Sequence, residues 1–293
     1  MILNMKVDSF FYRVMVKLSP LFPAKFYLKI LFRRWVGYKF NHNHPQTFNE
    51  KLNWLKLYDH NPLYTQLADK YLVKQYVSKV IGDEYVVPMY GVWDSFEKIE
   101  WDKLPNQFVL KATHDSSGTT ICKDKKSFDF KKAKAKFNMS LKNNYYWPER
   151  EWIYKNIKPR IIADKYLDDH TGRTLLDYKF WCFNGVPTYM YCTVKDKEIF
   201  ENFYDMNFNP VNINHGFSRR TPEFLKPKNF DKMKEFAKIL SKDMPFVRID
   251  FFEVEDHLYF GEFTFYDWGG ARPFNTIEQD YELGSLIKLP TEK

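Results

Sequence analysis

The sequence predicts an α+β protein in which two sheet-bearing lobes follow a helical N-terminal region. Apolar residues recur with helical spacing through about residues 10–81, and short runs rich in β-branched and aromatic residues take over from residue 107. Further helices are expected near residues 128–142, 228–242 and 277–287. A helical start, a mixed antiparallel sheet and a late helix are together typical of the α+β class.

We expect three successive regions along the chain. Residues 1–60 form a basic amphipathic helical region, and residues 61–106 form a segment of helix and strand. Residues 107–293 form a larger domain with a central lobe at about 107–165 and a C-terminal lobe at about 166–293. No repeat or low-complexity linker divides the chain.

The first 40 residues interleave bulky apolar side chains with Lys and Arg and contain almost no acid. Pro20 and Pro23 separate two helical segments, because proline cannot continue a helix through its interior. A basic amphipathic pair of this kind can lie on an anionic membrane surface. It can also pack as a helical cap on the main body, which is the alternative that we favour.

Two more helices are expected before the first strand. Thr47 is followed three residues later by Glu50, which is the pattern of a capping box at a helix start. Apolar spacing repeats over residues 63–81 and stops at Gly82, a residue suited to end a helix. The stretch at residues 84–93 then indicates a strand that leads into a turn.

Composition favours a cytoplasmic protein with an anionic partner. The formal net charge is +8, which suits a nucleotide, an acidic sugar or a membrane surface. The chain lacks a zinc finger, an RNP-type motif and a basic tail, so nucleic acid is not an expected partner. Three dispersed cysteines argue against a disulfide scaffold, and no leader or membrane-spanning run is apparent. We expect peripheral contact with the inner face of the membrane through the N-terminal helices.

A polar hairpin turn is the first candidate site. Lys111 ends an apolar strand, and His114–Gly118 form a small polar turn before the next strand. Backbone N–H groups and hydroxyls in a concave turn can bind phosphate oxygens, and a nearby lysine adds positive charge. An ordinary hairpin has the same composition, since Ser and Gly are common turn residues.

Two carboxylates on neighbouring strands are the second candidate site. Asp250 and Glu262 lie on apolar runs joined by a short polar turn, and Thr264 shares a strand face with Glu262. Magnesium binds few carboxylates together with nucleotide phosphates, which gives these acids a function. The alternative is a structural pair of buried acids held by Arg248 or Lys179.

Two further strand features are weaker signals. The strand that ends in Asp164–Leu167 exposes backbone groups suited to an adenine ring, although any strand end has this property. Asp177 and Lys179 alternate with core residues and point to one face, as sheet-face salt bridges do.

In this order, these fragments resemble the ATP-grasp superfamily and, more narrowly, its TupA-like family, which is associated with bacterial surface polysaccharides. The resemblance covers about residues 45–290 and rests on the combination of segments rather than on one motif. It implies an ATP-grasp fold that holds ATP between two sheets. The matching segments are TFNEKLNWLKLYDHNP, LADKYLVKQYV, EYVVPMYGVWD, FVLKATHDSSGTTICKDK, IIADKYL, DYKFWCFNGVP and RIDFFEVEDHLYFGEFTF.

The resemblance implies a role for each matching position. Three residues depart from the family pattern: Asp164 replaces the usual Glu, Thr264 replaces Asn, and Ser117 replaces a common Gly. The implied nucleotide contacts are Lys70, Lys74, Lys111, Ser116, Ser117, Gly118, Asp164, Lys165, Tyr166 and Leu167. The implied metal contacts are Asp250, Glu262 and Thr264; Arg248 and Lys179 serve the reacting phosphoryl group, and Trp268, Gly269, Gly270 and Arg272 the acceptor. His114 is our candidate for the general base.

The expected activity is that of an ADP-producing carboxylate–amine ligase with ATP and Mg²⁺ as cofactors. Its expected substrates are an anionic sugar or polysaccharide precursor, free or nucleotide- or lipid-linked, and an amine or amino acid. Amide formation on a uronic acid through an acyl phosphate would serve capsule or O-antigen biosynthesis. An ATP-grasp phosphotransferase and a non-enzymatic module that binds acidic polymer or membrane remain the alternatives.

Overall fold

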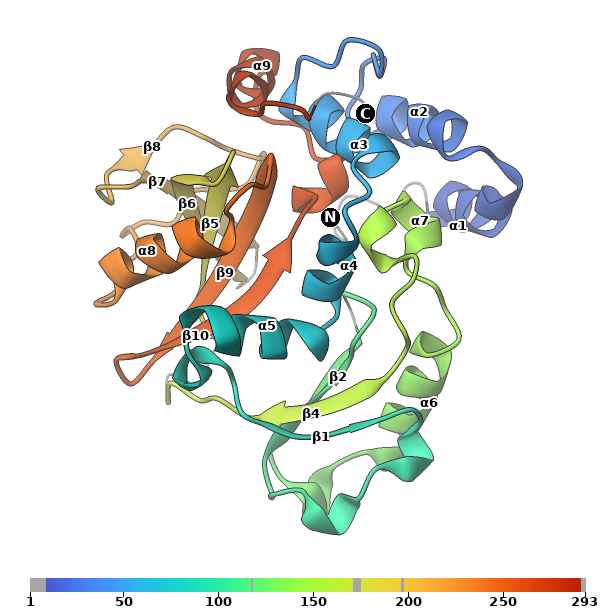
Figure 1. The fold of residues 1–293 in the computed structure, drawn as a ribbon, viewed down its shortest axis with the longest axis vertical. Helices are drawn as coiled ribbons and strands as arrows, with labels where there is room; N and C mark the ends of the chain where they lie inside the picture. The colour runs from blue at the N-terminus through green and yellow to red at the C-terminus, as the bar shows by residue number, and fades with distance from the viewer. Residues whose placement is uncertain (1–8, 117, 171–174, 196–197, 291–293) are drawn as a thin grey trace.

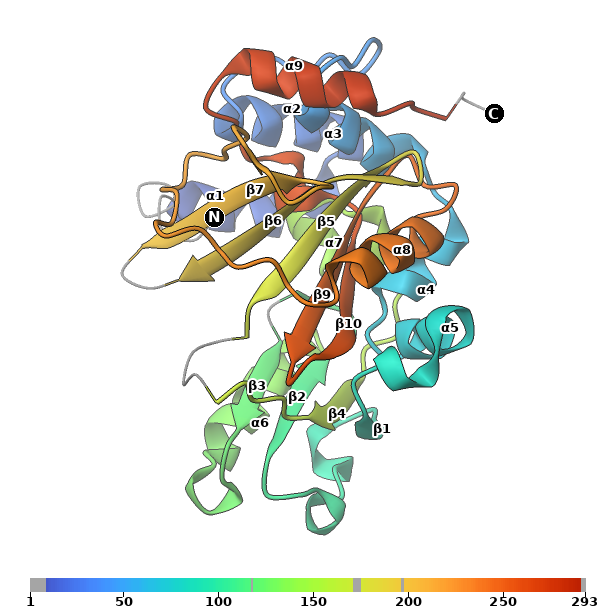
Figure 2. The same ribbon diagram turned by 90° about the vertical axis from the view of Figure 1, so that its left-hand side faces the viewer.

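The computed structural model describes residues 9–116, 118–170, 175–195 and 198–290. Two antiparallel sheets form separate lobes, with the smaller sheet at one end of the molecule and the N-terminal helices with α9 at the other (Figures 1 and 2). The α-helices are α1 (Ser9–Leu18), α2 (Ala24–Trp35), α3 (Phe48–Tyr58), α4 (Pro62–Ala68), α5 (Leu72–Ile81), α6 (Phe130–Ser140), α7 (Tyr146–Glu149), α8 (Phe230–Leu240) and α9 (Ile277–Leu286). The 3-10 helices are η2 (Ser19–Leu21), η3 (Asp83–Tyr85), η4 (Phe96–Lys98), η5 (Trp101–Lys103), η6 (Lys125–Ser127), η7 (Trp152–Tyr154) and η8 (Asp267–Gly270).

The smaller sheet has the strand order β1-β4-β2-β3. Alternate residues of β2 are buried, so Phe108 and Leu110 face a hydrophobic core that includes Phe137 of α6, and Lys111 points to the opposite face. That opposite face is the one turned toward the larger lobe. The strands are β1 (Met89–Trp93), β2 (Phe108–Ala112), β3 (Thr119–Cys122) and β4 (Ile161–Lys165).

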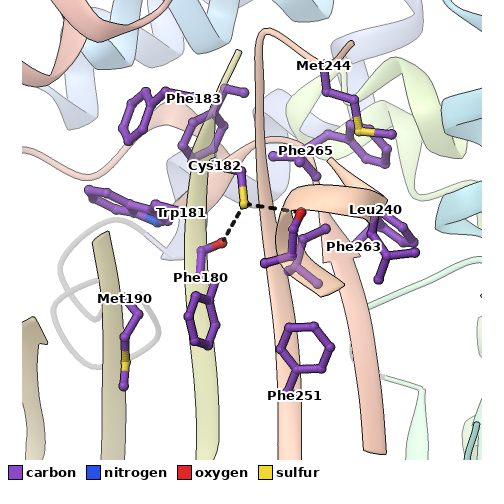
Figure 3. Close-up of a cluster of buried hydrophobic side chains, with 14 of the residues drawn as sticks. Phe180, Trp181, Cys182, Phe183, Met190, Leu240, Met244, Phe251, Phe263 and Phe265 are labelled. Carbon is purple, nitrogen blue, oxygen red and sulfur yellow. Dashed lines mark hydrogen bonds between the residues drawn. The ribbon is translucent and has the colours of Figure 1, made fainter. Parts of the chain in front are cut away.

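The larger sheet has the strand order β10-β9-β5-β6-β7-β8. Helix α8 packs on it, and Cys182 of β5 contacts the carbonyls of Phe180 and Ala237 at 3.8 Å within a cluster of aromatic side chains (Figure 3). Helix α3 contributes Phe48, which stacks on Trp181 with ring centroids 5.1 Å apart. The strands are β5 (Asp177–Phe183), β6 (Val186–Lys195), β7 (Ile199–Asp205), β8 (Pro210–Val211), β9 (Phe246–Val254) and β10 (His257–Thr264).

The N-terminal helices pack on the body and also present an exposed face. Helix α2 buries Tyr27, Leu28, Leu31 and Phe32, as expected of a helical cap. The turn between α1 and α2 exposes 76% of Leu21, so part of the apolar surface stays outside the core. None of the helices within the described ranges combines the length and the apolar composition that crossing a bilayer requires.

The α+β class with two sheets and N-terminal helices is confirmed, and so is the capping box of Thr47 and Glu50. The helix expected over residues 63–81 is instead two helices, α4 and α5. Helix α4 ends just before Asp69, which has extended backbone angles, and the Asp69 carboxylate accepts hydrogen bonds from the backbone N–H groups of Tyr71 and Leu72 where α5 begins. Strand β1 lies in the predicted 61–106 segment and pairs with β4 of the smaller sheet.

Candidate active site

A cavity of about 260 Å³ lies between the two lobes. The smaller sheet contributes Lys111 and Asp164 to its lining, the α4–α5 segment contributes Lys70 and Lys74, and the loop after β2 contributes Ser116. The larger sheet contributes acidic and basic groups from β5, β9 and β10, namely Asp177, Lys179, Asp250 and Glu262. Residues expected at an ATP site therefore converge from four parts of the sequence.

The Asp164 carboxylate forms ion pairs with Lys74 and Lys111, two of the lysines expected to contact phosphate. This buried carboxylate lies 3.0 Å from Lys74 Nζ and 2.8 Å from Lys111 Nζ. Burial lowers the pKa of Lys74, although the Asp164 carboxylate opposes this effect. Burial also lowers the pKa of Lys70, whose ammonium donates to the Asp115 carbonyl. Three lysine side chains are thus held around one cavity, which suits a polyphosphate.

The loop after β2 is closely packed against its own strand. The Gly118 N–H donates to Asp115 Oδ1 at 2.6 Å, and a Cβ at Gly118 would lie 2.7 Å from Ala112 Cβ. Glycine is therefore needed there. Ser116 hydrogen-bonds the Tyr145 hydroxyl. The prediction for Ser117 lies outside the described residues.

The two expected metal acids are bound by Arg248. Its Nε and Nη2 donate to the two oxygens of Asp250 at 2.7 Å each, and Nη2 also lies 3.1 Å from Glu262 Oε1. Thr264 Oγ1 donates to the same Glu262 oxygen at 3.2 Å. Burial disfavours the charged form of Asp250, but Arg248 and Lys179 outweigh it and hold the pKa of this carboxyl below its ordinary value.

A buried polar chain extends from Arg248 into the larger lobe. Arg248 Nη1 donates to Asp267 Oδ1 at 2.6 Å, and the other Asp267 oxygen, buried and without a hydrogen-bond partner among the described residues, lies 4.0 Å from His215 Nε2. His215 Nδ1 is in turn 3.1 Å from a Glu201 oxygen. Asp267, His215 and Glu201 were not among the residues predicted from the sequence. The position of Asp267 directly before the Trp-Gly-Gly turn was the available signal.

A second cavity of about 470 Å³ adjoins the first and shares Val87, Lys111, Asp177 and Phe252 with it. Lys165, Tyr166 and Leu167 line it together with apolar side chains and the charged side chains of Lys123 and Asp168. Apolar walls beside exposed backbone suit a planar base, so the expected adenine contacts and phosphate contacts lie in adjoining spaces.

A family model described as TupA-like ATPgrasp matches residues 50–288, which is most of the chain. The protein belongs to the TupA-like ATP-grasp family. The predicted family and fold class are therefore confirmed, and so is the expectation of an ATP-grasp enzyme at the level of family. No curated protein is significantly similar in sequence.

Solved structures similar to this TupA-like protein include other ATP-grasp proteins. D-Alanine-D-alanine ligase from Helicobacter pylori aligns with 14% identity and a TM-score of 0.41, over 82% of this chain and 69% of the ligase. A RimK-domain ATP-grasp protein from Sphaerobacter thermophilus aligns with 9% identity and a TM-score of 0.42, over 76% and 69%. The ATP-grasp ligase PsnB, complexed with a minimal precursor, aligns with 10% identity and a TM-score of 0.39, over 74% and 59%.

The acceptor residues implied by the TupA-like resemblance lie outside the lining of the first cavity. Trp268, Gly269 and Gly270 all have positive φ angles, from 48° to 64°, and a Cβ at Gly270 would lie 2.8 Å from Asn53. Arg272 is half-buried over the Phe217 ring and donates to the His215 carbonyl. Close packing thus fixes the course of this turn.

An unpredicted cluster lies next to this turn. The buried Lys56 ammonium donates to the Gly269 carbonyl at 2.6 Å and to the Glu149 carbonyl at 3.1 Å. Burial raises the pKa of Glu151 to about 8. The charge of Lys56 lowers this pKa, whereas the charges of Glu149 and Glu262 raise it further. The TupA-like protein therefore holds a carboxyl group that titrates near neutral pH beside the expected acceptor turn. The sequence signal for this cluster was the segment YWPEREW, in which Glu149 and Glu151 lie between aromatic residues.

His114 does not line the first cavity. Its ring is buried, and its Nε2 lies 2.9 Å from the Ser140 carbonyl of α6. The structure therefore does not bring the expected general base together with the lysines and acids.

Asp250 and Glu262 suit a magnesium ion that is also bound by the phosphate oxygens of a substrate. No group of three or more His, Cys, Asp and Glu in the part of the chain that the structure describes is arranged to hold a metal alone. Asp250 is buried and Glu262 has 48% of its side chain exposed, so one fixed and one accessible carboxylate face the cavity. Magnesium commonly takes one or two carboxylates plus substrate phosphates, and this donor set matches.

Proposed function

We propose that this TupA-like protein is an ATP-dependent carboxylate–amine ligase. The observation that carries the proposal is Arg248, which is held by Asp267 and binds Asp250 and Glu262, two carboxylates of a cavity that four lysines line. Fixed cations around one cavity stabilise the charge that develops when a phosphoryl group is transferred.

In the proposed reaction a substrate carboxylate attacks the γ-phosphorus of ATP, and ADP leaves. The resulting acyl phosphate is attacked by an amine, which forms an amide and releases phosphate. Lys111, Lys179 and Arg248 stabilise the phosphoryl charge, and Asp250, Glu262 and Thr264 would hold Mg²⁺, which neutralises phosphate oxygens when bound. The loop at Ser116 and Gly118 excludes water from the reacting group.

Glu151 is a better placed candidate than His114 for the proton that the attacking amine loses. A Cβ atom added to Gly269 would lie 3.5 Å from Glu151 Oε1, so this carboxyl group lies beside the acceptor turn. Its pKa of about 8 matches a group that exchanges protons near neutral pH. We assign the site of the attacking amine to Trp268, Gly269, Gly270 and Arg272 together with this carboxyl.

The substrates we propose are a uronic acid in a surface polysaccharide precursor and an amine or amino acid. The polysaccharide follows from the association that the resemblance implies for TupA-like proteins, and the net charge of +8 supports an anionic acceptor. Capsule or O-antigen biosynthesis would use such an amide.

We propose that the enzyme works in the cytoplasm at the inner face of the membrane. Residues 9–49 contain seven Lys or Arg and no Asp or Glu. Leu21 and Phe26 are 76% and 51% exposed on the surface of this segment. Basic residues around exposed apolar side chains favour the surface of an anionic bilayer.

Calorimetric titration with ATP, with and without Mg²⁺, tests the nucleotide site. We expect binding that depends on magnesium and is lost in the Asp250→Ala/Glu262→Ala variant. ADP release is then measured with galacturonic acid and a panel of amines. An amide product supports the ligase, whereas a stable phosphorylated sugar formed without amine would identify a phosphotransferase. Failure of the wild type to bind ATP would contradict both and favour the binding module.

A further inference from the structure

We propose that a groove between the N-terminal helices and the α6–α7 segment binds a carboxylated oligosaccharide, the acceptor of the proposed ligase. The groove has a volume of about 530 Å³, against about 260 Å³ for the first cavity. Val16 and Pro20 from the N-terminal helices form part of its wall. The inference rests on the proposed function, because it names the acceptor of the same reaction.

The groove adjoins the loop after β2, which the proposed function places at the phosphates of ATP. Asp115 and Gly118 of this loop line the groove, and so does Tyr145. The Tyr145 hydroxyl bonds Ser116, and Ser116 lines the first cavity. One loop and one tyrosine therefore stand between the two spaces. A sugar chain bound in the groove lies next to the place where the γ-phosphate is expected.

The lining has the chemistry of a site for an acidic sugar. Lys136 and Lys142 supply cations, and Lys142 Nζ makes no hydrogen bond or ion pair within the described ranges. Tyr145 and Trp147 supply aromatic surface, which packs against the C–H faces of sugar rings while lysines bind carboxylates. Asp115 is the sole acid among the described lining residues, and its carboxylate accepts from Gly118 and Ser140.

The wall of the groove is fixed by Arg150. This residue is 3% exposed and donates to the carbonyls of Ser19 and Phe22 in the turn between the N-terminal helices. Its guanidinium also lies 4.6 Å from the Trp147 ring centroid and 5.2 Å from that of Tyr27. The N-terminal helices, which precede the family match at residue 50, are thus held beside α7. A wall that is already ordered lowers the entropic cost of binding a chain.

The probe for the test is trigalacturonic acid, titrated by calorimetry in the presence of Mg²⁺ and a non-hydrolysable ATP analogue. We expect the wild type to bind it and Lys142→Glu to bind it at least about tenfold more weakly, since tenfold corresponds to about 1.4 kcal/mol. Lys131→Glu is the matched control, because Lys131 is exposed on α6 outside the groove lining. Neutral maltotriose is the control for charge.

The outcomes separate this inference from the proposed function. The groove assignment is overturned if nucleotide binds but the trimer does not, if Lys142→Glu binds the trimer as tightly as Lys131→Glu, or if maltotriose binds equally well. If the trimer binds with the expected pattern while nucleotide does not bind, the groove stands and the ligase proposal fails.

Discussion

Replacing Asp250 by Asn removes the charge that balances two buried cations while keeping the side-chain shape. Asp250 is 2% exposed, and both of its oxygens are bound by Arg248, with Lys179 at 3.4 Å. In the variant an NH₂ group would replace one of the two carboxylate oxygens that accept hydrogen bonds from Arg248, so a donor would face a donor. We expect the variant to lose both stability and magnesium-dependent nucleotide binding.

The magnitude follows from the partners that remain. Breaking a buried ion pair from one side costs about 3–5 kcal/mol. Arg248 retains Asp267 and Glu262, and Lys179 retains Asp177 at 2.8 Å, so we expect the lower end, about 3 kcal/mol. At roughly 2–4 °C per kcal/mol, this loss lowers Tm by about 6–12 °C.

Thermal unfolding followed by circular dichroism measures the effect, with and without Mg²⁺ and an ATP analogue. The analogue at about 100 times its Kd stabilises the wild type by about 2.7 kcal/mol, and we expect no such gain in Asp250→Asn. Asp102→Asn is the control, since Asp102 is exposed and makes no hydrogen bond within the described residues. A Tm for Asp250→Asn equal to that of this control, with the magnesium-dependent gain intact, would refute the reasoning.

Three further predictions use other parts of the structure. Because the folded state raises the pKa of Glu151 from 4.5 to about 8, it binds this proton more tightly than the unfolded chain does, and stability should fall as pH rises through this interval. Urea unfolding at several pH values should show that fall, and Glu151→Gln should flatten it; an unchanged slope would contradict the assignment. Arg150→Met should speed amide exchange in α2 while leaving β9 protected, because it removes the bonds to Ser19 and Phe22; equal protection of α2 would count against this role. Leu21→Glu/Phe26→Glu should stop the protein from sedimenting with phosphatidylglycerol vesicles, and neutral phosphatidylcholine vesicles give the baseline; undiminished sedimentation would exclude this surface.

Local patterns in the sequence predicted much of the site. The alternation of residues 246–264 placed Asp250 and Glu262 on paired strands, and the structure pairs β9 with β10. Lys111 at the end of a short apolar strand, with a polar turn after it, was equally readable. These features depend on neighbours within a few residues, so their period and turn chemistry carry the information.

Contacts between distant segments could not be predicted in the same way. Asp267 follows β10 and His215 follows β8, 52 residues earlier; they approach each other, and Asp267 meets Arg248 of β9, because these strands belong to one sheet. Lys56 occupies a buried position on α3, where a helical pattern would place an apolar residue, and two backbone carbonyls from other segments compensate its charge. Nothing in the sequence near these residues specifies such partners.

The pairing of β1 with β4 has a consequence for motion. The chain enters the smaller lobe through β1 and leaves it through β4, and Met89 lies opposite Asp164 in that pair. The smaller lobe has its own hydrophobic core, and it is joined to the rest of the molecule by this two-stranded stem and by the α6–α7 segment, which Arg150 holds to the N-terminal helices (Figure 1). Torsion of this stem would widen or narrow the nucleotide cavity and leave both cores intact. Nucleotide affinity and the resting angle of the stem are then thermodynamically linked, so a substitution in the stem can alter binding without touching the ligand.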